Sequence, residues 1–351
     1  MKKINRGVGL GVVTLLLFAG CSVKEPKFSK EEQNITLPFS NTTYFSKAFK
    51  KLNQLLISNH APTYRIQVKT IENLSSAKGA MPMDSSAFIR TPIVLNMNHI
   101  NLVAYEPIFN KYETKTTGFV YFPEMKKSIP QLVITGGVTQ FDKGIISTSN
   151  NFDLDVDVGG GDWQTDGRFN TDKSDSFSQI ALDLSMFQYQ NRIYVSGVAT
   201  TNKIEIHRKR KKNRFGLFLN GSGIGYSKYA TLQQSKDEAL RILTEYSLIQ
   251  LLGRLYQVPY WKCTTPHMAI DTDIVDNKVS QFNSSKKIIK FKRIERLIGL
   301  YGYRAKIDGK LSKQELVKLE KIYKKYHFKS KEVLSPSFYR ELYINTPIFS
   351  N

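Results

Sequence analysis

The sequence predicts an α/β core with two inserted β-hairpins, followed by a small helical unit at the C-terminus. Three observations predict this fold. Residues 64–137 show an order of strand, helix and strand, residues 145–230 contain two long stretches of alternating side chains, and apolar residues return at helical spacing after residue 290. We expect the core to span residues 61–261, with hairpins at about 145–187 and 195–230, and the helical unit to span residues 290–351.

The N-terminus has the pattern of an export signal. Positive residues precede an uncharged apolar run, Val8–Phe18, which leads to Cys21 through two small residues. This order is typical of a signal peptide, and the run is shorter than the roughly 20 residues of a membrane-spanning helix. We therefore expect residues 1–20 to be removed and residues 21–60 to form a polar tether that ends in a helix at Ser46–Ser58.

The residues before Cys21 resemble the lipobox of bacterial lipoproteins. Ala19-Gly20-Cys21 matches it, with Phe18 where leucine is usual. The resemblance implies a covalent lipid on Cys21, and no other cofactor is expected. Ser22 in place of aspartate implies the outer rather than the inner membrane. The alternative is a plain secretory signal that happens to contain a cysteine.

Charge and cysteine content narrow the set of partners. The net charge is +21, of which the signal region contributes +3, so the processed chain keeps +18. Such a charge indicates either a polyanionic partner or a solvated, lysine-rich surface. Export argues against nucleic acid and leaves lipopolysaccharide phosphates and the cell wall. If Cys21 carries a lipid, Cys263 has no partner within the chain, so no internal disulfide is expected.

The first part of the core predicts alternating strands and helices. Tyr64, Ile66 and Val68 alternate with polar residues, as in a half-buried strand. Two further strands are expected at Leu102–Tyr105 and Leu132–Gly137, the second ending at its glycines. A helix that carries Phe88, Ile89, Ile93, Leu95 and Met97 is expected before the first of these two strands.

The first hairpin is predicted to have one apolar and one acidic face. Apolar residues between Phe152 and Val158 alternate strictly with the acidic side chains Asp153, Asp155 and Asp157. Alternation resumes from Gln179 to Met186 on the returning strand. The aspartates also resemble the start of a calcium loop, but Val158 and Gln164 occupy its glycine and glutamate positions, so no metal is expected.

The second hairpin is predicted around a basic run. Two alternating stretches flank the cations Arg208, Lys209, Arg210, Lys211, Lys212 and Arg214. The stretch after the run reads as one returning strand, in which Gly221 and Gly223 allow close backbone packing. The run is either a solvated turn or an electrostatic contact, with lipopolysaccharide phosphates or with the acidic face of a neighbouring subunit.

A long helix and a basic C-terminal unit follow the hairpins. Ser235 and Glu238 form a capping box that starts the helix, and Pro259 follows its end. Residues 262–289 are polar and uneven, which predicts a linker. Between residues 285 and 351 there are 17 Lys or Arg and 6 Asp or Glu, a net charge of +11.

The C-terminal unit is similar to a peptidoglycan-binding module of the three-helix kind. Leu300-Tyr301-Gly302-Tyr303 and Ile307-Asp308-Gly309-Lys310 match its two turns, although Ser312-Lys313 replaces the usual Gly-Pro. The resemblance singles out Tyr303, Asp308 and Gly309. The alternative is a basic helical hairpin that docks on a ring.

Taken together, the lipid, the α/β core, the two hairpins and the packed helix resemble the CsgG family, the curli secretion channel and its relatives. The resemblance covers residues 61–261 and implies that each protomer gives its hairpins to a β-barrel shared by a ring of subunits, with the α/β core in the periplasm. One chain supplies too few strands to close, so a membrane role requires a homo-oligomer. In the family, a loop with aromatic and amide side chains narrows the channel; the corresponding loop here holds Met81, Pro82, Met83 and Asp84, which implies a constriction of different chemistry.

Catalytic motifs are missing from the sequence. The five histidines show no metal-ligand spacing, and neither a Gly-x-Ser-x-Gly elbow nor a phosphate-binding Gly-Lys-Ser loop occurs. We expect no enzyme but an oligomeric outer-membrane secretion or assembly channel, with peptidoglycan and an exported or appendage subunit as candidate partners. The alternative is a non-conducting periplasmic ring or collar that anchors an appendage or secretion machine to the outer membrane and cell wall.

Overall fold

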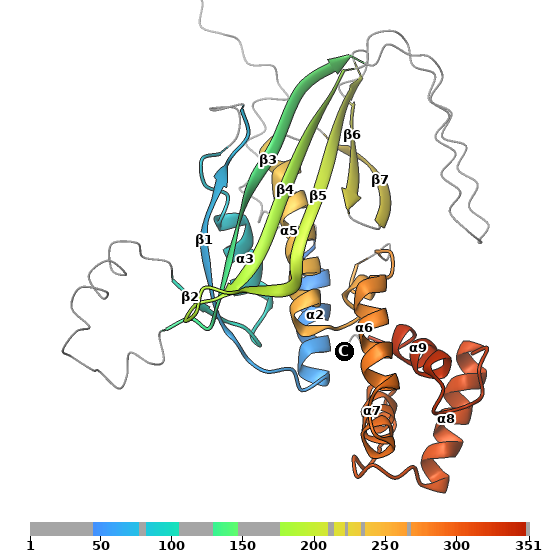
Figure 1. The fold of residues 1–351 in the computed structure, drawn as a ribbon. Helices are drawn as coiled ribbons and strands as arrows, with labels where there is room; N and C mark the ends of the chain where they lie inside the picture. The colour runs from blue at the N-terminus through green and yellow to red at the C-terminus, as the bar shows by residue number, and fades with distance from the viewer. Residues whose placement is uncertain are drawn as a thin grey trace, which may run out of the picture. The chain divides into compact units, whose positions relative to one another are not determined.

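One seven-stranded sheet organises the chain. The computed structural model describes residues 45–76, 82–104, 129–146, 176–209, 214–221, 224–232, 236–264 and 268–348. In this part of the chain the sheet runs in the order β2-β1-β3-β4-β5-β6-β7, and helices pack on one of its faces (Figure 1). This arrangement confirms the predicted α/β core.

The sheet combines a parallel part with a longer antiparallel part. Strand β1, the second from one edge, pairs in parallel with β2 and β3, and from β3 to β7 every neighbouring pair is antiparallel. The strands are β1 (Arg65–Asn73), β2 (Asn101–Val103), β3 (Leu132–Ile146), β4 (Ser176–Gln188), β5 (Tyr194–Lys209), β6 (Arg214–Gly221) and β7 (Ile224–Leu232).

Three helices form the layer against the sheet: α2 (Ser46–Ser58), α3 (Ala87–Asn96) and α5 (Lys236–Tyr256). The predicted apolar side of β4 is confirmed, because Ile180, Leu182, Leu184 and Met186 are at most 1% exposed. Every residue of α5 from Ala239 to Gly253 except Arg241 is buried, as expected of a helix enclosed on several sides. The predicted cap residue Ser235 lies outside the described residues.

Two glycines lie inside β3 instead of ending it, which corrects the expected end of this strand. A Cβ atom on Gly136 would lie 2.0 Å from the carbonyl oxygen of Asp183, and one on Gly137 would lie 2.8 Å from that of Glu72. Glycine at these positions therefore lets the neighbouring backbones approach. The strand continues past them for nine residues, to Ile146.

The stretch after the basic run forms two strands, not the single returning strand expected from its alternation. Strand β6 ends at Gly221, β7 begins at Ile224, and these two residues are paired in antiparallel register. Ser222 and Gly223, between them, lie outside the described residues.

Helix α3 forms in the expected region and buries only part of its apolar residues. It buries Ile89, Pro92 and Ile93, whereas Leu95 is 69% exposed and its neighbour Val94 is 68% exposed. Leu95 follows Ile93 by two residues, which turns it to the opposite side of an α-helix. Of the residues expected on this helix, Phe88, Ile89, Ile93 and Leu95 lie on it, and Met97 follows its last residue.

The predicted linker contains a helix fixed to the core. Helix α6 (Thr272–Asn283) begins at Asp271, whose carboxylate accepts hydrogen bonds from Tyr260 Oη and Arg254 Nε, both at 2.8 Å. Arg254 lies on α5 and also donates to the carbonyl of Ala199 on β5, at 2.6 Å. We call Arg254, Tyr260 and Asp271 the junction network, because it joins the sheet, α5 and the C-terminal helices.

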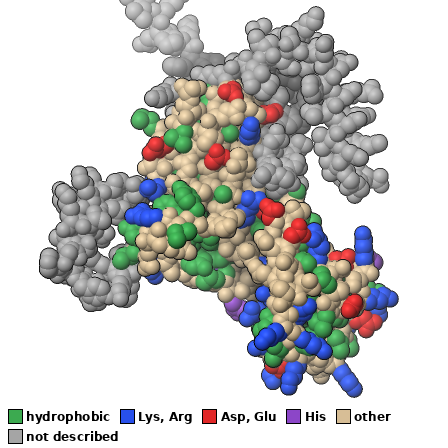
Figure 2. Space-filling view, in the orientation of Figure 1, with side chains coloured by type: hydrophobic (Ala, Val, Ile, Leu, Met, Phe, Trp, Pro, Cys, Tyr) green, Lys and Arg blue, Asp and Glu red, His purple; other side chains and the backbone are tan. Residues whose placement is uncertain are grey.

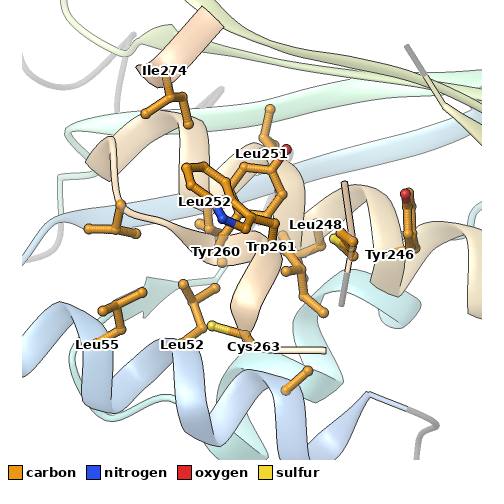
Figure 3. Close-up of a cluster of buried hydrophobic side chains, with 14 of the residues drawn as sticks. Leu52, Leu55, Tyr246, Leu248, Leu251, Leu252, Tyr260, Trp261, Cys263 and Ile274 are labelled. Carbon is orange, nitrogen blue, oxygen red and sulfur yellow. The ribbon is translucent and has the colours of Figure 1, made fainter. Parts of the chain in front are cut away.

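An apolar cluster surrounds the junction. Trp261 is 2% exposed and lies among side chains of α5, and the sulfur of Cys263 points toward Leu52 on α2 (Figure 3). Burial raises the pKa of the Cys263 thiol to about 12, which makes it unreactive at neutral pH.

Three more helices complete the C-terminal unit: α7 (Lys287–Leu300), α8 (Lys313–Tyr326) and α9 (Pro336–Ile344). Phe282 of α6 stacks on Tyr339 of α9, with ring centroids 4.1 Å apart. Tyr301 donates to the carbonyl of Leu342 at 2.8 Å, and Tyr343 donates to that of Gln257 at 2.8 Å.

Within the described ranges, no helix combines the length and apolar character needed to cross a membrane.

Candidate functional site

The antiparallel strands continue beyond the part of the sheet that β1 covers. The last residue of β3 that pairs with β1 is Val138, whereas β3 stays paired with β4 as far as Ile146. We call this region the sheet extension. It consists of residues 139–146, 176–182 and 202–209 with β6 and β7, and it forms the upper end of the strands in Figure 1.

The sheet extension has an edge strand at each end of its strand order. Among the residues that the structure describes, each edge strand has a hydrogen-bonded neighbour on one side only. At one end the edge strand is the far half of β3, and at the other end it is β7. Each such edge offers a row of backbone N–H and C=O groups to another strand. An extension with two open edges can add strands from further chains at both.

The base of the sheet extension has one apolar and one polar face. Phe141, Ile180 and Ile204 form one cross-strand row, and each is at most 4% exposed. The next row, Asp142-Gln179-Glu205, points to the other face. We call this row, together with the side chain of Gln140, the polar row.

Hydrogen bonds connect the polar row across three strands. The side-chain amide of Gln140 donates to Asp142 and, at 3.3 Å, to Gln179, whose own amide donates to Glu205 at 3.2 Å. The contacts fix four polar side chains on a surface that no helix of the described part of the chain covers. The polar row was not identified from the sequence, although polar residues at alternate positions of β3, β4 and β5 signal it.

Several predicted site residues lie outside the described residues: Cys21, Met81, Asp153, Asp155, Asp157, Arg210, Lys211 and Lys212. Of the basic run, Arg208 and Lys209 end β5 and Arg214 begins β6. The backbones of Lys209 and Arg214 form the last pair of the β5–β6 register. The run therefore begins and ends at the tip of a hairpin in the sheet extension.

The predicted constriction loop is attached to β1. Asp84 accepts hydrogen bonds from the backbone N–H of Ile71 at 3.1 Å and from the N–H and hydroxyl of Ser86, both at 2.8 Å. Burial opposes its ionisation, but these hydrogen bonds outweigh burial and hold the pKa of Asp84 below its usual value. Pro82 is half-buried and Met83 is 88% exposed. Asp84 thus has a structural role, and a channel-narrowing role for the loop stays a prediction.

The turn that resembles a peptidoglycan-binding module is held by a buried acid. Gly309 has a φ of +83°, and its N–H donates to both carboxylate oxygens of Glu295, at 3.1 and 3.0 Å. Asp308 accepts from the N–H of Lys310 at 2.9 Å, and Tyr303 packs against the core of the unit. The three predicted residues lie in one region, where Asp308 and Gly309 shape the turn.

The sequence analysis missed the roles of two glutamates in this unit. Glu295 is completely buried, and Glu315 forms a capping box with Ser312 at the start of α8. The spacing Ser-x-x-Glu signalled the second role. For the first role, the only signal was that Glu295 is the single acid in α7.

Side chains that could hold a metal do not converge in the described residues, where no group of three or more His, Cys, Asp or Glu has suitable geometry. A pocket of about 260 Å³ lies between α2, the end of α7 and the C-terminal segment. It is lined by Gln54, Leu55, Ser58, Gly299, Leu300, Pro347 and Ile348. These residues bring neither a nucleophile with a base nor a charged group, so the pocket suggests no reaction.

Comparisons with known proteins assign no family. No family model and no curated protein matches the sequence. Several solved structures are similar to part of the chain, among them the following two. Lipoprotein GNA1162 from Neisseria meningitidis is 11% identical, with a TM-score of 0.24, over 54% of this chain and 99% of that one. The hypothetical protein CT253 from Chlamydia trachomatis is 6% identical, with a TM-score of 0.28, over 55% and 96%. At these values neither similarity supports a functional assignment.

Proposed function

We propose that the protein is a lipid-anchored subunit of an outer-membrane ring that serves as a secretion or assembly channel of the curli-export type. The single observation that carries the proposal is the sheet extension, whose two edge strands, the far half of β3 and β7, are each paired on one side only within the described residues. The export signal and lipobox at Cys21 add the membrane attachment.

Ring formation follows from how the two edges are related. The two edges belong to different strands. If β7 of one subunit pairs with β3 of the next, the first subunit keeps a free β3 edge and the second keeps a free β7 edge, so further subunits can add in the same way. A contact of this head-to-tail kind closes into a ring when the rotation between subunits allows it. A strand edge within a bilayer must be paired, since its backbone groups find no water there.

The faces of the sheet extension suit a wall between two environments. The polar row gives one face carboxylate and amide groups, and the alternation of side chains would turn the opposite face toward apolar surroundings beyond α5. In the proposed ring the polar row lies toward the water-filled passage. The basic hairpin tip from Arg208 to Arg214 would lie in water beyond the lipid, because it cannot be buried in a bilayer.

Electron microscopy and conductance measurements on the detergent-extracted protein test the proposal. Images should show rings, and the rings should conduct ions across planar bilayers. A protein that stays monomeric at all concentrations would contradict the proposal.

A non-conducting collar is the second candidate function, and the junction network favours it. Arg254, Tyr260 and Asp271 fix the basic C-terminal helices to the core, as an anchor to the envelope requires. A collar would also form rings but would give no conductance, so the bilayer measurement separates the two candidates.

A further inference from the structure

Most acidic side chains of the C-terminal unit make contacts within the unit, and they are too few to neutralise its Lys and Arg side chains. Five of the six acids between residues 285 and 351 accept backbone hydrogen bonds or pair with a neighbouring lysine, and the unit still carries a net charge of +11. These five are Glu295, Asp308, Glu315, Glu320 and Glu341. Figure 2 shows Lys and Arg side chains gathered over these helices.

One side of α7 combines cations with an exposed apolar side chain. The helix buries Ile294, Glu295, Leu297 and Ile298. The opposite side, which we call the α7 outer face, carries Ile289, the half-buried Lys292 and Arg293, and the exposed Arg296.

The isoleucine of the α7 outer face is open to solvent. Ile289 is 40% exposed, and Ile288, which lies beside Gly309 at the border of this face, is 48% exposed. Both lie in the first turn of the helix, beside Lys286 and Lys287. The α7 outer face contains no acid, because the one acid of α7, Glu295, points into the unit and holds Gly309.

A second helix, α6, adds a cation to this surface. Lys278 on α6 is half-buried, and burial lowers its pKa, as do the nearby charges of Arg293 and Arg296. Arg293 reaches Gln281 at 3.5 Å, and no ion pair joins Lys278, Arg293 or Arg296 to an acid in the described part of the chain. Three cations thus stand together without a counter-charge, and an anion bound there would relieve their repulsion.

We propose that the α7 outer face, with Lys278, docks on an anionic lipid surface, its cations contacting headgroup phosphates and Ile289 entering the boundary of the acyl chains. Guanidinium groups match the geometry of phosphate oxygens. Apolar side chains interleaved with lysines distinguish a membrane-surface contact from a purely electrostatic one. This contact would be a second membrane attachment, separate from Cys21 and from ring formation.

Vesicle binding tests the proposal in the complete chain with Cys21→Ser, so that no lipid on that residue can hold the protein. We expect binding to vesicles of phosphatidylcholine with phosphatidylglycerol and little binding to phosphatidylcholine alone. The combined Lys292→Gln, Arg293→Gln and Arg296→Gln variant should bind about a hundred-fold more weakly, since each cation contributes roughly a factor of five near an anionic surface. Ile289→Ser should also weaken binding, and its effect should persist at high salt, where that of the cations is screened.

A matched control removes the same charge elsewhere. Lys313, Lys321 and Lys325 are exposed on α8, and replacing all three with glutamine should leave most of the binding intact. Equal losses in the two triple variants would overturn the proposal, because net charge alone would then explain binding. Binding of inorganic phosphate or of purified peptidoglycan without binding to anionic vesicles would overturn it as well. Electron microscopy of the same samples tests ring formation independently of vesicle binding. A chain can form rings and fail to bind vesicles, or bind vesicles and fail to form rings, so failure of one proposal is distinguishable from failure of the other.

Discussion

Removing the carboxylate of Asp271 should loosen the C-terminal helices from the core. Asp271 is the acceptor of the junction network, and its side chain is 3% exposed, against 14% for its partner Arg254. Asp271→Ala leaves the Arg254 charge without its carboxylate and the buried hydroxyl of Tyr260 without this acceptor. Breaking a buried ion pair costs about 3–5 kcal/mol. We expect the lower end of that range, because Arg254 keeps its hydrogen bond to Ala199.

Thermal unfolding followed by tryptophan fluorescence measures this loss. The chain has two tryptophans, so a Trp163→Phe background leaves Trp261, beside the junction, as the reporter. A loss of about 3 kcal/mol should lower the melting temperature by roughly 6–10 °C. Asp273→Ala is the matched control, since it removes an exposed acid from the first turn of the same helix and should change little. Equal melting temperatures for the two variants would refute the role assigned to the junction network.

Three further predictions follow from single positions. Gly309→Ala should lose about 1–3 kcal/mol of stability, because an alanine at a φ of +83° is strained and its Cβ would lie 2.4 Å from Ile288 Cγ1. Gly299→Ala, whose Cβ would meet nothing within 4 Å, should be neutral or stabilising in the same melting experiment; an equal loss in both would count against this reason. Burial opposes ionisation of Glu315, but hydrogen bonds from Ser312 lower its pKa, so its contribution to stability is complete above the usual value of 4.5 and is lost as the pH falls below it. Glu315→Gln should remove this dependence in melts at acidic pH, and an unchanged pH profile would contradict it. Cys21→Ser should abolish labelling with palmitate, and unchanged labelling and membrane fractionation would show that the lipobox was misread.

Periodicity was enough to predict the core elements. The spacing of Phe49, Leu52 and Leu56 predicted α2 at its observed bounds, and the alternation from Ile180 to Met186 predicted the buried side of β4. These patterns succeed because each element buries one side, and the period of burial differs between a helix and a strand. The α/β class followed from the order of the elements.

Where the sequence misled, a local signal had two structural meanings. Gly136 and Gly137 were predicted to end a strand. The structure instead places the backbones of Asp183 and Glu72 so close to them that only glycine fits, which the sequence pattern could not show. Residues 262–289 were predicted to be a linker because their composition is polar. The residues that bind Asp271 lie earlier in the chain, on α5 and in the segment before α6, so the composition of residues 262–289 could not show that they are fixed to the core. Contacts between residues distant in the sequence cannot be read from composition.

The candidate site was predictable only in outline. The hairpins were expected, but the open edges of β3 and β7 depend on where the pairing of β1 ends, which no local pattern encodes. The α7 outer face was equally hidden. Its lysines were counted in the net charge, yet only the burial of Glu295 shows that this surface carries no acid.

Disulfide cross-linking between the two edges tests the central claim most directly. Thr139→Cys in β3 would be combined with Ser227→Cys in β7, and neighbouring positions of β7 would be scanned because the register between subunits is open. The natural Cys263 should not interfere, since its thiol is buried and its pKa is raised to about 12. Head-to-tail pairing predicts a ladder of covalent oligomers on oxidation, only when both cysteines are present in one chain. Monomers alone, or dimers without higher species, for every pair of positions would contradict a ring built through these edges.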